Sequence, residues 1–136
     1  MDCYFVDSNI FLRFYNADEP EQKNAAREVF LKAKRGEIEL LCGPPVFFEV
    51  AWVLRSRYKI PNSTVIDTLE SMIALPGLYI LDDGFVKAAL ELARKNNQSY
   101  SDAYIAVTAK EHGAGVVSFN ARHFAKPGTK MYPFGV

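Results

Sequence analysis

Short apolar runs alternate along this chain with longer segments of helical periodicity. Runs of four or five apolar residues are typical of buried strands, and apolar side chains that recur every three or four positions indicate helices. The pattern predicts strands at 3–6, 39–42, 78–81 and 115–119, with a short fifth strand at 131–134. It predicts helices that begin at Ser8 and that cover 21–35, 46–58, 61–74, 85–95 and 99–111.

This alternation predicts an α/β fold. Strands that are apolar throughout, each followed by helices, form parallel sheets whose two faces are both covered. We therefore expect a central, mostly parallel sheet of four or five short strands, flanked by helices in a three-layer sandwich. No internal repeat, low-complexity tract or linker interrupts the chain, so residues 1–136 are interpreted as one domain.

Composition and charge are those of an ordinary globular protein and give no sign of a nucleic-acid-binding or membrane protein. The chain is 49% hydrophobic and carries 16 basic and 16 acidic residues, so its formal net charge is zero. No global positive field attracts nucleic acid, although a local basic rim is still compatible with these numbers. The opening residues lack a basic segment of the signal-peptide type, and no apolar run is long enough to span a bilayer. We expect a soluble, cytoplasmic protein.

The two cysteines are too few for a disulfide scaffold. Cys3 and Cys42 both lie within apolar runs, which predicts small buried thiols in a reducing compartment. A zinc site built from them with His112 and His123 lacks the paired ligand spacing that such sites show.

Polar residues at the carboxyl ends of the predicted strands are the first candidates for chemistry, because sites in open parallel sheets collect there. Asp7 follows the first strand and Asn120 follows the fourth. Asp102 lies in the first turn of the helix at 99–111. Glu49 is the single charged residue between Gly43 and Leu54.

Each candidate also has a structural interpretation. Asp7 can cap the following helix, and Asn120 is an ordinary turn residue. Asp102 can complement the helix dipole and form a capping box with Ser99. We expect Glu49 to be buried in so apolar a helix, where an ion pair with an arginine would neutralise it, and the candidate partners are Arg13 and Arg55.

If the strands adjoin, three carboxylates and one amide oxygen meet in one cleft. Their mutual repulsion is relieved by a divalent cation, and a set of hard oxygen donors favours Mg²⁺ or Mn²⁺ over zinc. Acidic clusters of this kind handle phosphate esters, because the metal polarises the phosphoryl oxygen and activates a water molecule.

The segments FVDSNIFLRF, FFEVAWVL, SYSDAYIAVTAKEHGAGVVSFNARHF and MYPF together resemble the PIN-domain ribonucleases, most of all the VapC-type toxins of type II toxin–antitoxin pairs. The resemblance implies a metal-dependent endoribonuclease, or hydrolase of phosphodiester bonds, that cuts single-stranded or looped RNA such as tRNA. Asp7, Glu49 and Asp102 would hold Mg²⁺ or Mn²⁺. Asn120 occupies a catalytic position that is frequently aspartate, which puts a second tightly held metal in doubt.

The resemblance also implies supporting residues and partners. Ser8 and Asn9, with Ser101 as a weaker candidate, would steady the waters of the metal. A cognate antitoxin protein and a homodimer are the implied partners. Candidate contacts to RNA are a set of cationic and aromatic side chains: Arg13, Arg122, His123 and Tyr100. Trp52, like Tyr100, could stack on a splayed base. It lies in an apolar helix, however, so we expect it to pack in the core.

Two other functions stay open on the sequence. Asn120 favours a PIN-like module that binds RNA or a protein partner without cutting. A phosphatase or phosphoacceptor with Asp7 as nucleophile is the third reading. It is weakened because no second aspartate follows Asp7 at two residues and no lysine lies just past a late strand.

Overall fold

The computed structural model describes residues 1–125 and 128–134. The chain divides into two compact units, Met1–Asp83 and Gly84–Val136. A single domain over residues 1–136 therefore stays a prediction. Among the described residues, no helix combines the length and the apolar character needed to cross a membrane.

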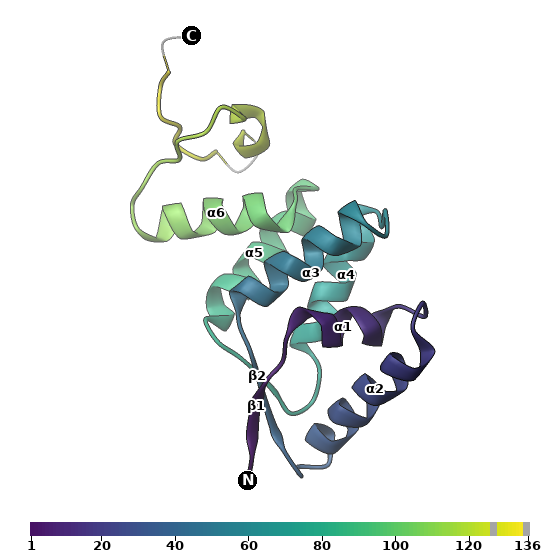
Figure 1. The fold of residues 1–136 in the computed structure, drawn as a ribbon. Helices are drawn as coiled ribbons and strands as arrows, with labels where there is room; N and C mark the ends of the chain where they lie inside the picture. Colours follow the sequence, from purple (N-terminus) through teal and green to yellow (C-terminus); the bar gives the residue numbers. More distant parts are fainter. Residues whose placement is uncertain (126–127, 135–136) are drawn as a thin grey trace. The chain divides into compact units, whose positions relative to one another are not determined.

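The first unit is built on a three-stranded parallel sheet. Its strands lie in the order β1-β2-β3, which confirms the α/β class and the parallel pairing. Each strand is joined to the next by two helices (Figure 1). In chain order the elements are β1 (Cys3–Phe5), α1 (Ser8–Tyr15), α2 (Pro20–Lys34), β2 (Glu39–Cys42), α3 (Pro44–Ser56), α4 (Asn62–Ile73) and β3 (Leu78–Ile80).

The register gives the sheet one buried and one open face. Cys42 pairs with Ile80, and both side chains are buried. On the opposite face Phe5 aligns with Leu41 and Tyr79, and the two aromatic rings are 56% and 67% exposed. Consecutive side chains of a strand point to opposite faces, so this difference follows directly from the alternation.

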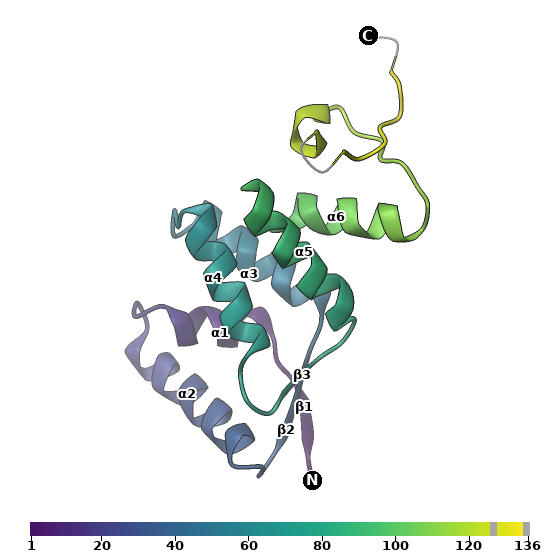
Figure 2. The same ribbon diagram turned by 180° about the vertical axis from the view of Figure 1, so that it is seen from behind.

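Aromatic packing joins α1 to α2, which lie side by side in both ribbon views (Figures 1 and 2). The ring centroid of Phe30 in α2 lies 5.5 Å from that of Phe11 and 4.8 Å from that of Phe14. Phe11 is completely buried. α1 also contacts α3, so this packing holds the helix that begins directly after Asp7.

The second unit contains α5 (Asp83–Asn96), which begins at the last residue of the first unit, α6 (Tyr100–Glu111) and a short 3-10 helix, η1 (Ala121–Phe124). Ala106, Val116 and Phe124 form its buried cluster, against which Leu92 and Met131 pack.

The fourth and fifth strands predicted at 115–119 and 131–134 are not formed as strands. In the described part of the chain, these segments form only one parallel bridge, between Val116 and Met131. Val116 donates to Lys130 O and accepts from Tyr132 N, both at 2.8 Å. Pro133 has no N–H with which to extend such a ladder. The sheet therefore has three strands rather than the four or five expected.

The cysteines differ from each other, contrary to the expectation that both are buried. Cys3 is exposed, whereas Cys42 is buried, and burial raises the pKa of the Cys42 thiol to about 12. We expect iodoacetamide to modify Cys3 and to leave Cys42 intact in the native protein, because the thiolate is the reactive form. Intact mass would show one adduct under native conditions and two in denaturant. Two adducts on the native protein would contradict this assignment.

Candidate functional site

Asp7 is the N-cap residue of α1, and its carboxylate caps nothing. The backbone at Asp7 is extended (φ −79°, ψ 158°), and no side-chain capping hydrogen bond is formed. Val6 N donates to Leu41 O, so the pairing of β1 with β2 continues to the residue before Asp7. The carboxylate is exposed and has no ion-pair partner among the described residues. Capping therefore does not account for an aspartate at this position.

Glu49 is exposed, so the expectation that it is buried is wrong. It lies on α3 between the buried residues Phe47 and Val50. Helical geometry turns it outward, because successive residues are about 100° apart around a helix of 3.6 residues per turn. The expected ion pairs are also wrong for the described residues. Arg13 pairs with Asp18, and Arg55 donates to Asn62 Oδ1 at 3.0 Å.

Ser8 is a buried polar residue beside Asp7. It is the first residue of α1, it is completely buried, and its hydroxyl has no hydrogen-bond partner among the described residues. An unsatisfied buried hydroxyl costs about 1–3 kcal/mol, so its presence calls for a functional explanation. Asn9, the next residue, is exposed.

Asp102 is held at the start of α6. Ser99 is the N-cap, and its Oγ accepts from Asp102 N at 3.2 Å, which confirms the cap predicted for this helix. The Asp102 carboxylate lies 3.3 Å from His123 Nδ1 and is one-quarter exposed. Gln98 Nε2 donates to the backbone oxygen of His123 at 2.7 Å, which holds that residue in η1. Of the predicted RNA contacts, His123 is thus placed directly at a candidate metal ligand.

Asn120 is the N-cap of η1 and is exposed. Its backbone N–H donates to Ser118 Oγ at 3.0 Å, and its carbonyl accepts from His123 N at 3.0 Å. The backbone thus behaves as an ordinary turn, while the side-chain amide has no partner among the described residues. Arg122 and Ser101 are exposed in the same unit.

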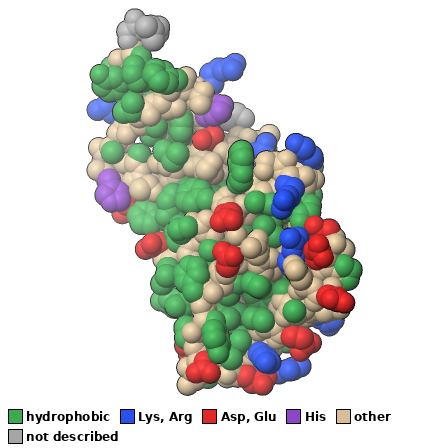
Figure 3. Space-filling view, in the orientation of Figure 1, with side chains coloured by type: hydrophobic (Ala, Val, Ile, Leu, Met, Phe, Trp, Pro, Cys, Tyr) green, Lys and Arg blue, Asp and Glu red, His purple; other side chains and the backbone are tan. Residues whose placement is uncertain are grey.

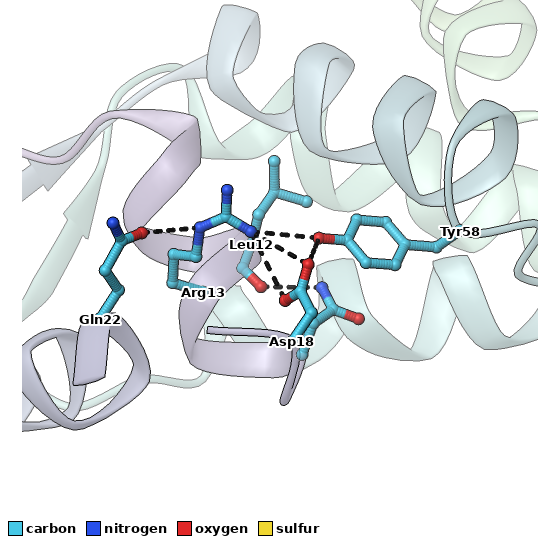
Figure 4. A network of polar contacts seen from close by, with 6 residues as sticks. Leu12, Arg13, Asp18, Gln22 and Tyr58 are labelled. Carbon is cyan, nitrogen blue, oxygen red and sulfur yellow. Dashed lines mark hydrogen bonds and ion pairs between the residues drawn. The ribbon is translucent and has the colours of Figure 1, made fainter. Parts of the chain in front are cut away.

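Arg13 belongs to a network that joins three parts of the first unit (Figure 4). Arg13 Nη1 lies 3.2 Å from Asp18 Oδ2 and 3.3 Å from Tyr58 Oη, and Arg13 Nε donates to Gln22 Oε1 at 2.9 Å. Tyr58 donates its hydroxyl proton to Asp18 at 2.7 Å. These contacts link α1 and the N-terminal part of α2 to the segment after α3. The structure therefore gives Arg13 a structural role, and its contact with RNA stays a prediction.

The hydrogen bond from Tyr58 lowers the pKa of the Asp18 carboxyl, and the same bond raises the pKa of the Tyr58 hydroxyl. A depressed carboxyl pKa stabilises the fold above the unfolded value of about 4 and loses that contribution as pH falls through the folded value. We expect Tyr58→Phe to lower the free energy of unfolding slightly at pH 7, with the difference from wild type shrinking below about pH 4. Urea unfolding across this pH range measures it, and a difference independent of pH would contradict the assignment.

Two aromatic side chains occupy the opposite environments from those expected. Tyr100 is 2% exposed and its ring lies 5.9 Å from that of Tyr104, so it offers no open face to an RNA base. Trp52 was expected in the core, yet it is 70% exposed. Both predictions were wrong about which side of a helix is buried. The apolar residues of these two helices do not mark one side clearly enough to decide this.

The donors present suit a hard divalent cation. Among the described residues, no three His, Cys, Asp or Glu side chains are grouped to hold a metal ion. The candidates are divided by unit, with Asp7 and Glu49 in the first and Asp102 and Asn120 in the second. Carboxylate and hydroxyl oxygens without partners, at Asp7, Glu49 and Ser8, are nevertheless donors of the kind that Mg²⁺ prefers.

Charges of both signs are interspersed over the face seen in Figure 3. Acidic side chains also lie amid hydrophobic ones near the middle of this face (Figure 3). This mixture of charges agrees with the zero net charge of the chain. Any contact with nucleic acid therefore depends on local groups of residues.

Comparison with known proteins gives one family. Two solved structures are similar to this chain at low sequence identity. A toxin–antitoxin complex from Klebsiella pneumoniae is 16% identical with a TM-score of 0.37, and 100% of each chain is covered. VapBC2 from Rickettsia felis, bound to a DNA fragment from its promoter, is 20% identical with a TM-score of 0.37, covering 96% of this chain and 97% of that one. No curated protein sequence matches. The family model of the PIN domain matches residues 4–129, and the chain therefore belongs to the PIN domain family, whose members are generally nucleases.

Proposed function

We propose that this PIN domain is a Mg²⁺- or Mn²⁺-dependent endoribonuclease that acts on single-stranded or looped RNA such as tRNA. The observation that carries the proposal is the pair of exposed carboxylates in the first unit that have no ion-pair partner among the described residues. Asp7 and Glu49 have no ion-pair partner among the described residues, and neither caps nor neutralises another group. Structural explanations were available for both, and the contacts of the first unit support neither.

The proposed metal ligands are three carboxylates of the chain. Asp7 and Glu49 would hold the ion together with Asp102, directly or through water, and the family match covers all of these residues. The Ser8 hydroxyl, which is buried and has no hydrogen-bond partner among the described residues, would accept a hydrogen bond from a water of the metal. Asn9 and Ser101 are weaker candidates for the same supporting role.

The bound ion would polarise the phosphodiester and lower the pKa of a water molecule, which is the chemistry that such ions supply to phosphate esters. The carboxylates fix the position of this charge next to the scissile bond. Asn120 contributes an amide oxygen without charge, which favours one tightly held ion over two. His123, which lies 3.3 Å from Asp102, and the exposed Arg122 would contact an RNA phosphate.

The resemblance of the sequence to VapC-type toxins supports a more specific cellular role for the proposed nuclease. We assign the chain as the toxin of a type II toxin–antitoxin pair in the cytoplasm, inhibited by a cognate antitoxin protein and active as a homodimer. Light scattering of the purified chain tests the dimer.

A second candidate is a PIN domain that binds RNA or a protein without cutting, and the uncharged Asn120 favours it. Incubation with total tRNA, with and without Mg²⁺ or Mn²⁺, separates the two. The nuclease produces discrete fragments only with metal. Protein that is folded and free of antitoxin, and that binds tRNA without producing fragments, would identify the second candidate.

A further inference from the structure

Trp52 is an exposed tryptophan with no ring partner. It is the single tryptophan of the chain, 70% of it is exposed, and it has no ring contact with any described residue. Its backbone oxygen accepts from Ser56 Oγ at 2.7 Å, so the backbone of this turn is satisfied and the indole alone is left open. Tryptophan has a large apolar ring and one N–H donor, and at this exposed position neither has a partner in the described part of the protein.

The neighbours of Trp52 on α3 are a carboxylate and a cation. Glu49 precedes it by three residues and Arg55 follows it by three. Residues three apart lie on the same side of a helix, so the three side chains form one row, about 4.5 Å apart along the helix axis. In the proposed function, Glu49 holds the metal at one end of this row.

The segment at the end of α3 is strongly basic in an otherwise neutral chain. Arg55, Arg57 and Lys59 are exposed, and no acidic residue occurs from Val50 to Ile66. Arg57 and Lys59 have no ion-pair partner among the described residues. The carboxylate of Asp18, which accepts from Tyr58 in this segment, is already paired with Arg13. The positive charge beside Trp52 is therefore not neutralised locally.

We propose that Trp52 stacks on an unpaired base of the substrate RNA while Arg55 and its basic neighbours contact the adjoining phosphates. This inference rests on the proposed function and names a recognition element for it. Aromatic rings with nearby cations are the usual means of binding single-stranded nucleic acid, because a ring stacks on any base while the cations follow the backbone. The row would then place a stacked base about one helical turn from Glu49.

Other occupants fit this surface less well. A second copy of the chain would need acidic side chains opposite Arg57 and Lys59, and its own copy of this segment has none from Val50 to Ile66. An acidic segment of a protein partner would satisfy the charges, but it would not explain why the ring lies next to Glu49. Binding of a protein partner in place of RNA would leave the RNA affinity of Trp52→Ala unchanged.

Intrinsic fluorescence tests the proposal directly, because Trp52 is the only tryptophan. Oligoadenylate and oligouridylate of about eight nucleotides, added in EDTA to prevent cleavage, should quench the wild-type emission. Anisotropy of the labelled oligonucleotides should show about tenfold or greater weakening for Trp52→Ala and a smaller effect for Trp52→Phe. Arg55→Ala should reduce the slope of log affinity against log salt by about 0.7, whereas Lys32→Ala on α2 should leave it unchanged.

The outcomes separate this proposal from the nuclease proposal. If the wild type cleaves tRNA and Trp52→Ala leaves KM, RNA affinity and circular dichroism unchanged, the stacking role is overturned and the nuclease stands. If wild-type protein binds and is quenched without cutting, stacking stands and the nuclease falls. A Trp52→Ala variant with normal RNA affinity that has lost its dimer in light scattering would assign this surface to protein contact and overturn the proposal.

Discussion

Replacing Asp7 by Asn should lower the rate of RNA cleavage by about a thousandfold, since the transition-state stabilisation from a bound metal is worth several kcal/mol and each ~1.4 kcal/mol is a factor of ten. The fold should be unaffected. The Asp7 carboxylate makes no capping hydrogen bond, and Asn is as good an N-cap residue as Asp. Glu49→Gln and Asp102→Asn should have effects of the same order, because each removes one negative charge from the proposed site.

Cleavage of labelled tRNA under single-turnover conditions measures these rates. Glu28→Gln, an exposed carboxylate on α2, is the matched control and should cleave as the wild type does. Circular dichroism and urea unfolding establish that the variants are folded. Activity that persists in Asp7→Asn and Asp102→Asn together would show that these carboxylates are not the ligands of a catalytic metal.

The largest effect on stability is expected from Phe11→Ala. Phe11 is completely buried in α1 and packs against Phe30 of α2, so truncation removes buried apolar surface and leaves a cavity. Such changes cost about 3–5 kcal/mol in protein cores. Because α1 begins directly after Asp7, loss of this packing should also reduce metal-dependent cleavage in the fraction that stays folded.

Equilibrium unfolding in urea checks the prediction, with Trp52→Ala as a matched aromatic control. Trp52 is exposed, and its removal should change the free energy of unfolding by less than about 0.5 kcal/mol. Equal losses of stability in the two variants would contradict the burial assigned to these rings.

Most of the secondary structure follows from local pattern. The strand at 39–42 is formed with the predicted bounds, and α2 and α6 differ by a residue at their ends from the predicted ranges. The failures lie at 115–119 and 131–134, which are short, largely apolar runs, the first with two β-branched valines. Whether such a run becomes a strand depends on a partner backbone elsewhere in the chain, and only Val116 and Met131 bridge here.

The sequence names the candidate site residues, and their identity stays a prediction, whereas their surroundings come from the structure. The position of Asp102 in the first turn of α6 follows from the cap that Ser99 forms. The sequence also suggests Ser8 as the cap of α1, but there Asp7 is the N-cap residue and Ser8 forms no capping bond. Glu49 and Trp52 were both expected to be buried, since α3 is apolar on nearly every side and its periodicity does not reveal which face is open. The alternation of basic residues after Leu54, without a nearby acidic residue, indicates an exposed basic segment and was overlooked.

The pairing of Arg13 with Asp18 and Tyr58 was beyond sequence reasoning for a different reason. Tyr58 lies far from both along the chain, and only the contact of α1 with α3 brings it to them. Such tertiary contacts decide whether a surface arginine is available to RNA or already engaged.

The central proposal is that Asp7, Glu49 and Asp102 hold one metal ion, and calorimetric titration with Mn²⁺ tests it most directly. The wild type should bind the ion with a stoichiometry near one, and both Asp7→Asn and Asp102→Asn should lose most of that affinity, while Glu28→Gln keeps it. Mn²⁺ binding that survives unchanged in Asp7→Asn or in Asp102→Asn would contradict a shared site and with it the proposed nuclease mechanism.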